Sequence, residues 1–228
     1  MTYRQNDILA HLPPDELAQL APHLELHSLT KGQVLFRHGG AITHIHFPVS
    51  AVISLSLQLA DGFGAETQML GHSCLVGVGG FGSATSSSTA TVSVAGLAFR
   101  VPLLDFQKQF AQGAGLMRSV LCQVRLAGSN MQQSIVCSKH HSLTQQLAKW
   151  MLNMHDKNKG DVLDFSHQEI ALLLGFRQEG VTVALGLMEA AQLIAMKSKQ
   201  IELLNHSALE QVACECYQEM RNLEPCTS

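Results

Sequence analysis

The stretch FSHQEIALLLGFRQEGVTVALGLMEAAQLI, residues 165–194, decides the fold of the carboxyl-terminal part of the chain. Ser166, followed three residues later by Glu169, is a capping box, which predicts that a helix begins here. Apolar residues then recur at helical spacing before Gly175, which suits a tight turn, and again in a second helix expected from about residue 177 to 191. The pattern predicts a helix-turn-helix, with an ordinary helical hairpin as the alternative.

The residues that follow favour the helix-turn-helix over the hairpin of helices. Residues 193–204 place two apolar runs on either side of the polar tip Lys197-Ser198-Lys199-Gln200, which predicts a β-hairpin. Ser207 and Glu210 form a second capping box at the start of a final helix that we expect to run toward Arg221. A helix-turn-helix followed by a β-hairpin and a helix is a winged helix.

The composition predicts two folded domains in one cytoplasmic chain. Its 228 residues exceed the usual size of one domain, and 46% hydrophobic with 14% charged residues allows substantial cores. We expect no signal peptide and no membrane span, because no apolar run is long enough. Without an export signal, the scattered cysteines are interpreted as reduced thiols, which indicates the cytoplasm. They are Cys74, Cys122, Cys137, Cys214, Cys216 and Cys226.

The first hundred residues predict β structure. Short β-rich runs alternate with glycine-containing turns, which is typical of a small sandwich or barrel that offers a binding pocket. The expected strands cover residues 24–29, 33–36, 44–47, 51–57, 65–70, 89–94 and 97–101. No nucleophile with a nearby base and no carboxylate pair is recognisable, so we expect that the chain is not an enzyme.

A long helix with an apolar seam is predicted between the two regions. Its seam residues are spaced by four or three positions, a heptad pattern of about three repeats. They are Met117, Leu121, Val124, Gly128, Met131 and Ile135. The alternative is a helix that packs on its own domain. We favour a parallel homodimer, because a pair of winged helices spans two half-sites one DNA turn apart.

A barrel, a dimerisation helix and a winged helix in this order resemble the Crp/Fnr superfamily of bacterial transcription regulators. The strongest local matches are Gln168-Glu169-Ile170, Leu174-Gly175, Glu179 and Val181. The resemblance implies a chain of the α+β class with a β-barrel in which a signal is sensed. It also implies that the second helix of the motif enters the major groove of DNA.

The resemblance further implies three regions and their partners. Residues 1–112 are expected to form the effector-sensing domain, a jelly-roll-like, double-stranded β-helix barrel. Residues 113–138 are expected to form the dimerisation helix, and residues 139–228 the winged helix-turn-helix DNA-binding domain. The partners expected are double-stranded DNA, a second copy of the chain and, for an activator, RNA polymerase.

The residues with which some members of the superfamily bind cyclic nucleotides are absent. Those members carry a Glu for the ribose hydroxyl and an Arg for the phosphate, where this chain has Val78 and either Ser87 or Ser88. No Lys or Arg occurs in residues 38–99, so a buried phosphate would lack its charge-assisted hydrogen bonds. We predict that the barrel senses a signal other than a cyclic nucleotide.

The interior of the barrel suits a small, largely neutral or apolar ligand, or no ligand. The glycines Gly77, Gly79 and Gly82 spell G-x-G-x-x-G, but a strand rather than a helix is expected to follow, so we interpret them as a turn. The pocket residues that we expect are Glu66, Gly77, Gly79, Ser87 and Ser88.

We predict no cofactor, and expect neither haem nor a metal ion. No cysteine precedes Cys74, which excludes the amino-terminal iron–sulfur cluster of Fnr-like sensors. His44 and His46 alternate on one side of a strand, but such pairs are more often ordinary polar residues. Cys214 and Cys216 are expected on the last helix, where residues two apart diverge, so no metal site is predicted there.

The carboxyl-terminal domain has few positive charges for binding DNA. From residue 139 onward, eight basic residues stand against eleven acidic ones, although neutralisation of phosphates normally supplies most of the affinity. Arg177 is suited to grip guanine with two hydrogen bonds, and lysines on the hairpin are suited to touch phosphates. The expected DNA-binding residues are Ser166, Arg177, Gln178, Glu179, Thr182, Lys197 and Lys199.

The leading hypothesis is a homodimeric, sequence-specific DNA-binding transcription regulator whose barrel senses an unidentified signal. The alternative is a Crp/Fnr-like sensor or interaction module with weak or lost DNA binding, which the net negative charge of the domain favours.

Overall fold

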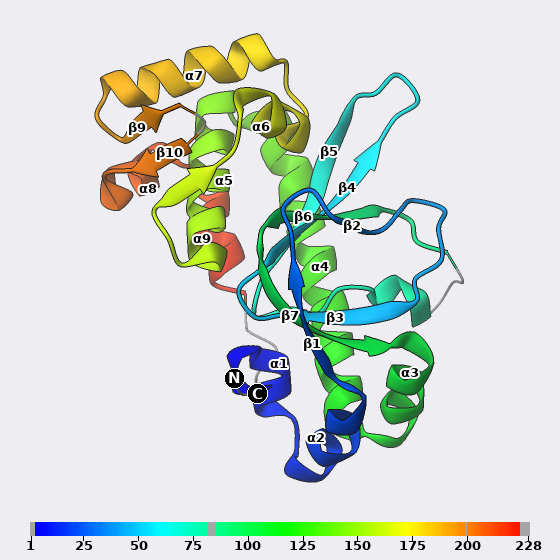
Figure 1. Ribbon diagram of the computed structural model, residues 1–228. Coiled ribbons are helices and arrows are strands. Elements are labelled where there is room, and N and C mark those ends of the chain that lie inside the picture. The colour runs from blue at the N-terminus through cyan, green and yellow to red at the C-terminus, as the bar shows by residue number, and fades with distance from the viewer. Residues whose placement is uncertain (1–2, 82–84, 199, 224–228) are drawn as a thin grey trace. The chain divides into compact units, whose positions relative to one another are not determined.

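The computed structural model of the protein describes residues 3–81, 85–198 and 200–223 (Figure 1). Its contacts divide the chain into two compact units. The first contains the residues up to Leu57 and Gln68–Gly128, and the second contains Gln58–Thr67 and Ser129–Leu223. The architecture is a mixed α/β fold with an N-terminal region of β-sheets, a long helix and a C-terminal helix-turn-helix region, as the sequence predicts.

All seven predicted strands of the first region are present, in two sheets. A three-stranded sheet has the order β1-β7-β3, and a four-stranded sheet has the order β2-β6-β4-β5. The strands are β1 (Glu25–Leu29), β2 (Val34–Phe36), β3 (His44–Pro48), β4 (Val52–Gln58), β5 (Gly64–Leu70), β6 (Thr89–Val94) and β7 (Gly96–Pro102). Since the described strands stay in two separate sheets, the jelly-roll-like barrel of the prediction holds only as a loose description.

A shared core joins the two sheets. Leu29 of β1 and Ala98 of β7, from the three-stranded sheet, are buried in one cluster with Ile53 of β4 and Val92 of β6, from the four-stranded sheet. Their burial removes apolar surface of both sheets from water, which stabilises the arrangement by roughly 25 cal/mol per Å² of buried apolar area.

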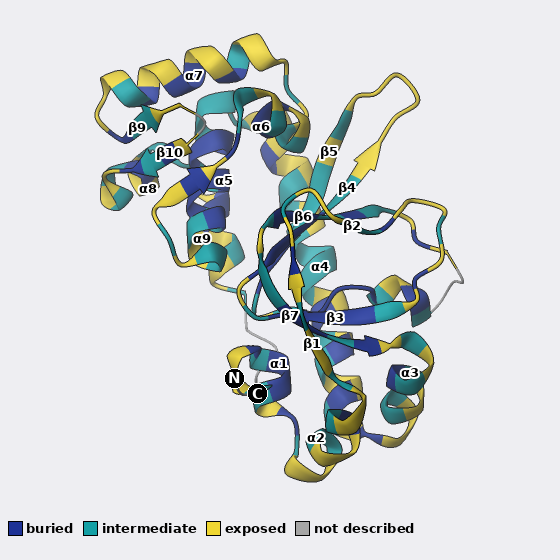
Figure 2. Cartoon of the chain, in the orientation of Figure 1, coloured by how far each residue is buried: buried dark blue, intermediate teal, exposed yellow. Residues whose placement is uncertain are grey.

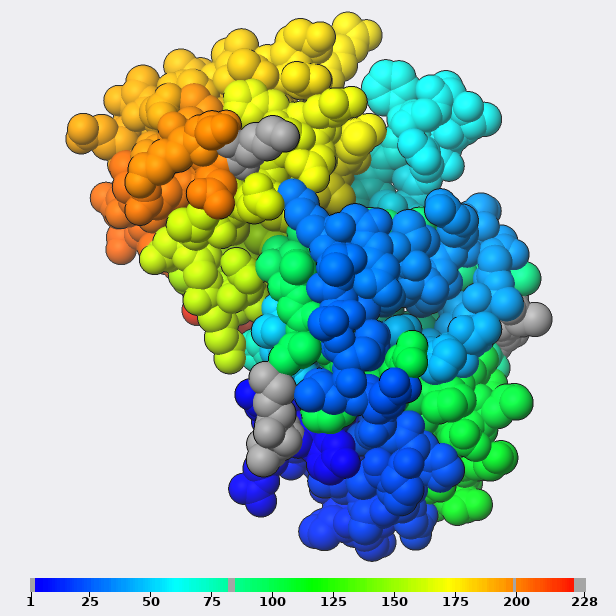
Figure 3. Space-filling model, in the orientation of Figure 1, coloured from blue at the N-terminus to red at the C-terminus, as the bar shows by residue number. Residues whose placement is uncertain are grey.

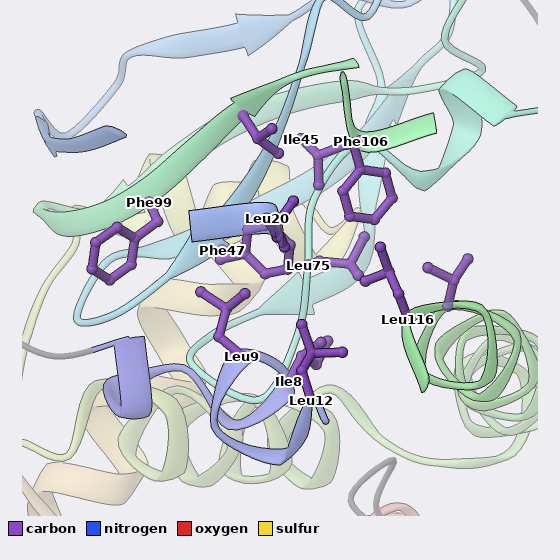
Figure 4. Close-up of a cluster of buried hydrophobic side chains, with 12 residues drawn as sticks. Ile8, Leu9, Leu12, Leu20, Ile45, Phe47, Leu75, Phe99, Phe106 and Leu116 are labelled. Carbon is purple, nitrogen blue, oxygen red and sulfur yellow. The ribbon is translucent and has the colours of Figure 1, made fainter. Parts of the chain in front are cut away.

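Helices cover a second apolar cluster of the first unit, which Figure 4 shows. Ile8 and Leu9 of α1, Phe47 of β3, Phe106 of α3 and Leu116 of α4 are all buried there. The helical elements of this part are η1 (Tyr3–Gln5), α1 (Asp7–His11), α2 (Pro14–Leu20), η2 (Ala21–His23), η3 (Val78–Phe81), α3 (Leu103–Gln112) and α4 (Ala114–His140). The cluster therefore packs the beginning of the long helix α4 against a sheet of its own unit.

The second unit is built around α5 (Leu143–Asn158), of whose 16 residues seven are buried (Figure 2). A three-stranded sheet with the order β8-β10-β9 accompanies it. The other elements are β8 (Val162–Asp164), α6 (His167–Leu174), α7 (Gln178–Ala190), β9 (Ile194–Lys197), β10 (Gln200–Leu203), α8 (His206–Val212) and α9 (Cys216–Arg221). The predicted order of helix, turn, helix, hairpin and helix is confirmed.

The prediction of one final helix that begins at Ser207 is wrong. Asn205 is the N-cap of α8, because its side-chain oxygen accepts a hydrogen bond from the Ala208 amide at 3.0 Å. The helix ends at Val212, and the separate helix α9 begins at Cys216. Cys214 consequently lies in the connection between two helices rather than on one of them.

Candidate nucleic-acid interface

The turn between α6 and α7 has the geometry that its sequence predicts. Ser166 and Glu169 form the capping box: the Ser166 Oγ accepts from the Glu169 amide at 3.2 Å, and a Glu169 carboxylate oxygen accepts from the Ser166 amide at 2.7 Å. Gly175 ends α6 in the left-handed conformation, with φ of 73°. Ile170 and Val181 are fully buried and pack the two helices onto the unit.

The helices α6 and α7 are bent by 112° relative to each other, within the range of a helix-turn-helix. In the part of the chain that the structure describes, no single helix is long and apolar enough to cross a membrane. The α6–α7 pair meets the length and composition requirement only when the two bent helices are taken together.

One end of α7 presents three polar side chains of the predicted interface. Arg177, Gln178 and Glu179 are consecutive and exposed, and α7 is open at the surface of its unit (Figure 3). Arg177 occupies the N-cap position, and no side chain in the described ranges caps the helix. The first amides of α7 and its positive dipole end are therefore open to an anion such as a DNA phosphate.

Other predicted DNA-binding residues already have partners. The Ser166 hydroxyl donates to Glu169 at 2.8 Å, and the Thr182 Oγ1 lies 3.0 Å from Nδ1 of His167. On the hairpin, the Lys197 ammonium pairs with Glu202 at 2.5 Å, and Lys199 lies outside the described residues. The sequence missed the Glu202 partner, because only the register of β9 and β10 brings the two side chains together.

The residues predicted to line a ligand pocket lie on a strand, in a short helix and in loops. Glu66 is half-buried on β5, Ser87 is exposed, and Ser88 donates its amide to the Ser86 hydroxyl at 3.2 Å. Gly77 has a φ of 109°, and a Cβ there would lie 2.9 Å from the His44 carbonyl oxygen.

Gly77 is therefore required by a close approach of backbone to backbone. Gly79 lies beside it in η3, and Gly82 falls outside the described residues. The helix η3 has only four residues, so it lacks the longer helix that the dinucleotide fingerprint needs.

Three histidines gather on the β1-β7-β3 sheet. The rings of His44 and His46 lie 6.3 Å apart, on one side of β3 as expected, and His27 of β1 lies 5.4 Å from His46. Burial, together with the charges of His27, His44 and Arg100, lowers the pKa of His46 to about 3. His46 is therefore neutral at physiological pH. Its buried Nδ1 has no hydrogen-bond partner within the described ranges.

The predicted seam of α4 is exposed on the single chain. Leu121 and Ile135 are 59% and 58% exposed, and Met117, Val124 and Met131 are exposed as well. A Cβ at Gly128 would meet no described atom within 4 Å, so another backbone has room to approach it closely. The neighbouring face of the helix, with Leu116 and Val120, is buried in the first unit.

The expectation of reduced thiols is confirmed for four described cysteines and wrong for Cys122. Cys74, Cys137, Cys214 and Cys216 are free, Cys122 is disulfide-bonded, and Cys226 lies outside the described residues. The prediction that Cys214 and Cys216 diverge is also wrong: their sulfur atoms gather with those of Cys137 and a nitrogen of His141 within 4.8 Å. Burial and a hydrogen bond with Cys137 raise the pKa of Cys214 to about 12.

A second group of possible metal ligands lies elsewhere in the same unit. The Asp161 carboxylate is 3.2 Å from His155 and 2.8 Å from His206, with the two imidazole rings 4.1 Å apart. Asp161 is exposed, and the three side chains already satisfy one another by hydrogen bonds and ring contact.

Residues 145–212 match the family model described as the Crp-like helix-turn-helix domain. The fold is similar to that of a putative Crp/Fnr-family transcriptional regulator from Eubacterium rectale, at 16% identity and a TM-score of 0.72, covering 92% of this chain and 98% of that one. FixK2 from Bradyrhizobium japonicum is similar at 13% identity and a TM-score of 0.68, with coverage of 84% and 98%.

The regulator CLP from Xanthomonas campestris, described as responsive to c-di-GMP, is similar at 15% identity and a TM-score of 0.67, with coverage of 85% and 100%. No curated protein matches the chain in sequence. These findings define a protein with a β-sheet domain and a helix-turn-helix domain. Residues 145–212 match the Crp-like helix-turn-helix domain and the chain has the fold of the Crp/Fnr transcription regulators, so the predicted resemblance is confirmed.

Proposed function

We propose that the protein is a homodimeric, sequence-specific DNA-binding transcription regulator without enzymatic activity, whose N-terminal β domain senses a small signal other than a cyclic nucleotide. In this proposal residues 1–112 sense the signal, residues 113–138 form the dimerisation helix and residues 139–228 bind DNA in the cytoplasm. If the protein activates transcription, RNA polymerase is a further partner. The exposed and uncapped amino-terminal end of α7 is the observation that carries the proposal.

The recognition end of α7 combines two ways of binding DNA. Arg177 and Gln178 supply the hydrogen-bonding groups that suit guanine and adenine edges in the major groove. The open amides at the start of α7 attract a phosphate through the helix dipole, without a further basic residue. This combination compensates for the small number of positive charges in the domain.

The exposed seam of α4 supports the homodimer. Leu121 and Ile135, which are 59% and 58% exposed, would be removed from water if a second copy of α4 packed along the seam. In an isolated chain, five large apolar side chains along one side of α4 would be exposed to water, which is unfavourable in free energy. A second copy of the same helix covers this stripe by heptad packing, and the resulting dimer carries two copies of α7 for a two-fold-symmetric site.

The charge of the β domain supports a signal without phosphate groups. No Lys or Arg lies in residues 38–99, and the nearby Arg100 is bound to Glu25 through two hydrogen bonds of 3.0 and 2.8 Å. A cyclic nucleotide, or a dinucleotide of the kind named for CLP, would leave its phosphates unpaired inside the domain.

The test is selection of genomic DNA fragments by the purified protein, followed by fluorescence anisotropy of the enriched fragments at several salt concentrations. A shared two-fold-symmetric sequence, with affinity that falls as salt rises, is the expected result. The selection is repeated with cell extract as a source of the signal. Absence of enrichment in both selections would contradict the proposal.

Two observations favour the alternative, a sensor or interaction module with weak or lost DNA binding. The Lys197–Glu202 ion pair neutralises the one hairpin lysine that the structure describes, and the domain is net negative. The selection distinguishes the two functions directly, because a module of this kind enriches no sequence under any condition while it still dimerises.

A further inference from the structure

Four side chains with metal-binding atoms meet at the end of the long helix, within the second unit. Cys137 lies on α4, and His141 directly follows the end of this helix, where its amide donates to the Cys137 carbonyl at 3.0 Å. Cys214 comes from the connection between α8 and α9, and Cys216 is the first residue of α9. The three thiols are buried, and the His141 side chain is 13% exposed.

The spacing of the four atoms is that of a tetrahedral zinc site. Zn–S and Zn–N bonds of about 2.3 and 2.0–2.1 Å at tetrahedral angles place two sulfurs about 3.8 Å apart, and a sulfur and a nitrogen about 3.6 Å apart. The Sγ atoms of Cys137 and Cys214 are 3.6 Å apart, and Nδ1 of His141 is 3.5 Å from Sγ of Cys216. All four atoms lie within 4.8 Å of one another.

Groups around these four atoms hold them in the orientation that a metal requires. A Glu215 carboxylate oxygen lies 3.2 Å from Nε2 of His141, which fixes the proton on Nε2 and leaves Nδ1 to face the thiols. Gln133 donates an N–H to Sγ of Cys216 at 3.0 Å, and the Lys149 ammonium donates to Sγ of Cys137 at 3.2 Å. Donors aimed at sulfur stabilise thiolates, and a carboxylate behind a histidine is the usual partner of a metal-bound imidazole.

The surroundings of Cys137 in this cluster favour the ionised form of its thiol. Burial opposes the charged form, but the hydrogen bond with His141 and the charge of Lys149 outweigh it, so the pKa of the Cys137 thiol is lowered. Burial raises the pKa of Cys214 and of Cys216.

We propose that Cys137, His141, Cys214 and Cys216 together bind one zinc ion as a closed structural site. Binding of Zn²⁺ displaces the protons that remain on the three thiols, and the three thiolates and neutral imidazole leave a site charge of minus one, which Lys149 offsets. Four protein ligands leave no open position for a substrate or a nucleophilic water, so the site is structural rather than catalytic. The metal joins the end of α4 to the C-terminal segment that contains α9.

The chemistry of the cluster favours a metal over a disulfide. A bond between Cys137 and Cys214 would use two of the four groups, would require a two-electron oxidant and would leave the roles of His141 and Glu215 unexplained. Three sulfurs and one imidazole are a ligand set that selects a thiophilic, tetrahedral ion, which in proteins is most often zinc.

The experiment measures metal bound per chain. The full-length protein is purified under reducing conditions without chelator, its metal content is determined by mass spectrometry, and a sample stripped of metal is reloaded with Zn²⁺ or Co²⁺. We expect one equivalent of zinc, and a cobalt form with an intense thiolate-to-metal charge-transfer band and the strong visible bands of tetrahedral Co²⁺. Cys214→Ser and Cys216→Ser should each lose the metal.

Two matched controls separate this site from other possible sites. Cys74→Ser removes a free thiol outside the cluster, and His206→Asn removes a member of the His155–Asp161–His206 group. Both variants should bind one equivalent of zinc per chain and, when loaded with Co²⁺, give the same visible spectrum as the wild type. Loss of the metal in His206→Asn, with retention in the cysteine variants, would overturn the proposal.

X-ray absorption of the zinc-loaded wild type tests the ligands even if the cysteine variants do not fold. The expected first shell contains three sulfurs at about 2.3 Å and one nitrogen at about 2.0–2.1 Å. A shell without sulfur, or failure of the reduced protein to retain zinc after reloading, would contradict the site. Neither result depends on DNA binding, so the proposal is tested independently of the proposed regulatory function.

Discussion

The side-chain amide of Gln123 forms two hydrogen bonds with the backbone of Leu75. Its Oε1 accepts from the Leu75 amide at 2.8 Å, and its Nε2 donates to the Leu75 carbonyl at 2.6 Å. Gln123 is only 7% exposed, and Leu75 is fully buried. The pair satisfies two buried backbone groups and fixes α4 to the chain that follows β5, within the first unit.

Replacing Gln123 with Leu should lower the free energy of unfolding by about 2–4 kcal/mol, because it leaves the Leu75 N–H and C=O buried without partners. The measurement is urea denaturation at a fixed protein concentration. Gln132→Leu is the matched control, since Gln132 is an exposed glutamine of the same helix, and it should change stability by less than about 0.5 kcal/mol. Equal midpoints for the two variants would show that the Leu75 groups find other partners.

Replacing Leu121 with Glu should convert the proposed homodimer into monomers and abolish binding to operator DNA. A charge at a heptad position that is buried only in the dimer carries a large desolvation cost. Sedimentation equilibrium measures the assembly state. Leu104→Glu serves as the control, because Leu104 is 71% exposed on α3, away from the seam, and this variant should stay dimeric. A Leu121→Glu protein that remains dimeric would disprove the seam.

The elements of the fold follow from local patterns, which is why the sequence predicts them. Alternating apolar residues indicate the seven strands, and the Ser166–Glu169 capping box marks the start of α6 at the residue where the structure has it. The strand β8 escapes prediction because Val162–Asp164 is too short to show a period. Asn205, rather than Ser207, caps α8, because two residues with capping side chains, separated by His206, compete for the same role.

The metal-binding cluster could not be predicted, because it depends on contacts between distant residues. Cys137 and Cys214 are 77 positions apart in the chain, and neither carries the short spacing of a usual zinc motif. The break between α8 and α9 decides where Cys214 points, and it is visible only in the structure. Gln123 is a similar case, because it is buried against Leu75, which is 48 positions away in the chain.

Replacing Arg177 with Ala should weaken binding to the selected operator by about 1–3 kcal/mol and relax specificity at one base pair of each half-site. The reason is the loss of two hydrogen bonds from one guanidinium to a guanine. Anisotropy on the operator and on its single-base variants measures both effects. The control is Lys157→Ala on α5, which should leave the base preference unchanged. If Arg177→Ala weakened binding equally to every sequence, Arg177 would contact a phosphate instead.

Acid should destabilise the first unit through His46. Its pKa is lowered to about 3 in the folded chain, from an ordinary value of 6.5, by burial and by the neighbouring His27, His44 and Arg100. The unfolded chain therefore takes up the proton more readily, so stability is complete above pH 6.5 and declines as the pH falls toward 3. The loss from this residue should reach about 2 kcal/mol at pH 5.

The pH dependence is measured by urea denaturation between pH 7.5 and 5 for wild type and His46→Gln. The variant lacks the titrating group, so its stability should fall less steeply with decreasing pH, whatever its stability at pH 7.5. His140→Gln replaces an exposed histidine and should retain the slope of the wild type. Parallel curves for wild type and His46→Gln would show that other groups cause the acid sensitivity.

Replacing Glu215 with Gln should lower the affinity for zinc by about 10–100-fold while the four ligands remain in place. The carboxylate that lies 3.2 Å from Nε2 of His141 acts as a positioning group, because it orients the ring and makes Nδ1 a stronger ligand. Competition with a chromophoric chelator measures the affinity, and the cobalt spectrum should keep its tetrahedral form. Glu219→Gln, an exposed change on α9, the helix that Glu215 precedes, should bind zinc as the wild type does. If both variants bound zinc with equal affinity, His141 would be oriented without Glu215. If the cobalt spectrum of Glu215→Gln showed a changed coordination geometry, Glu215 would itself be a metal ligand.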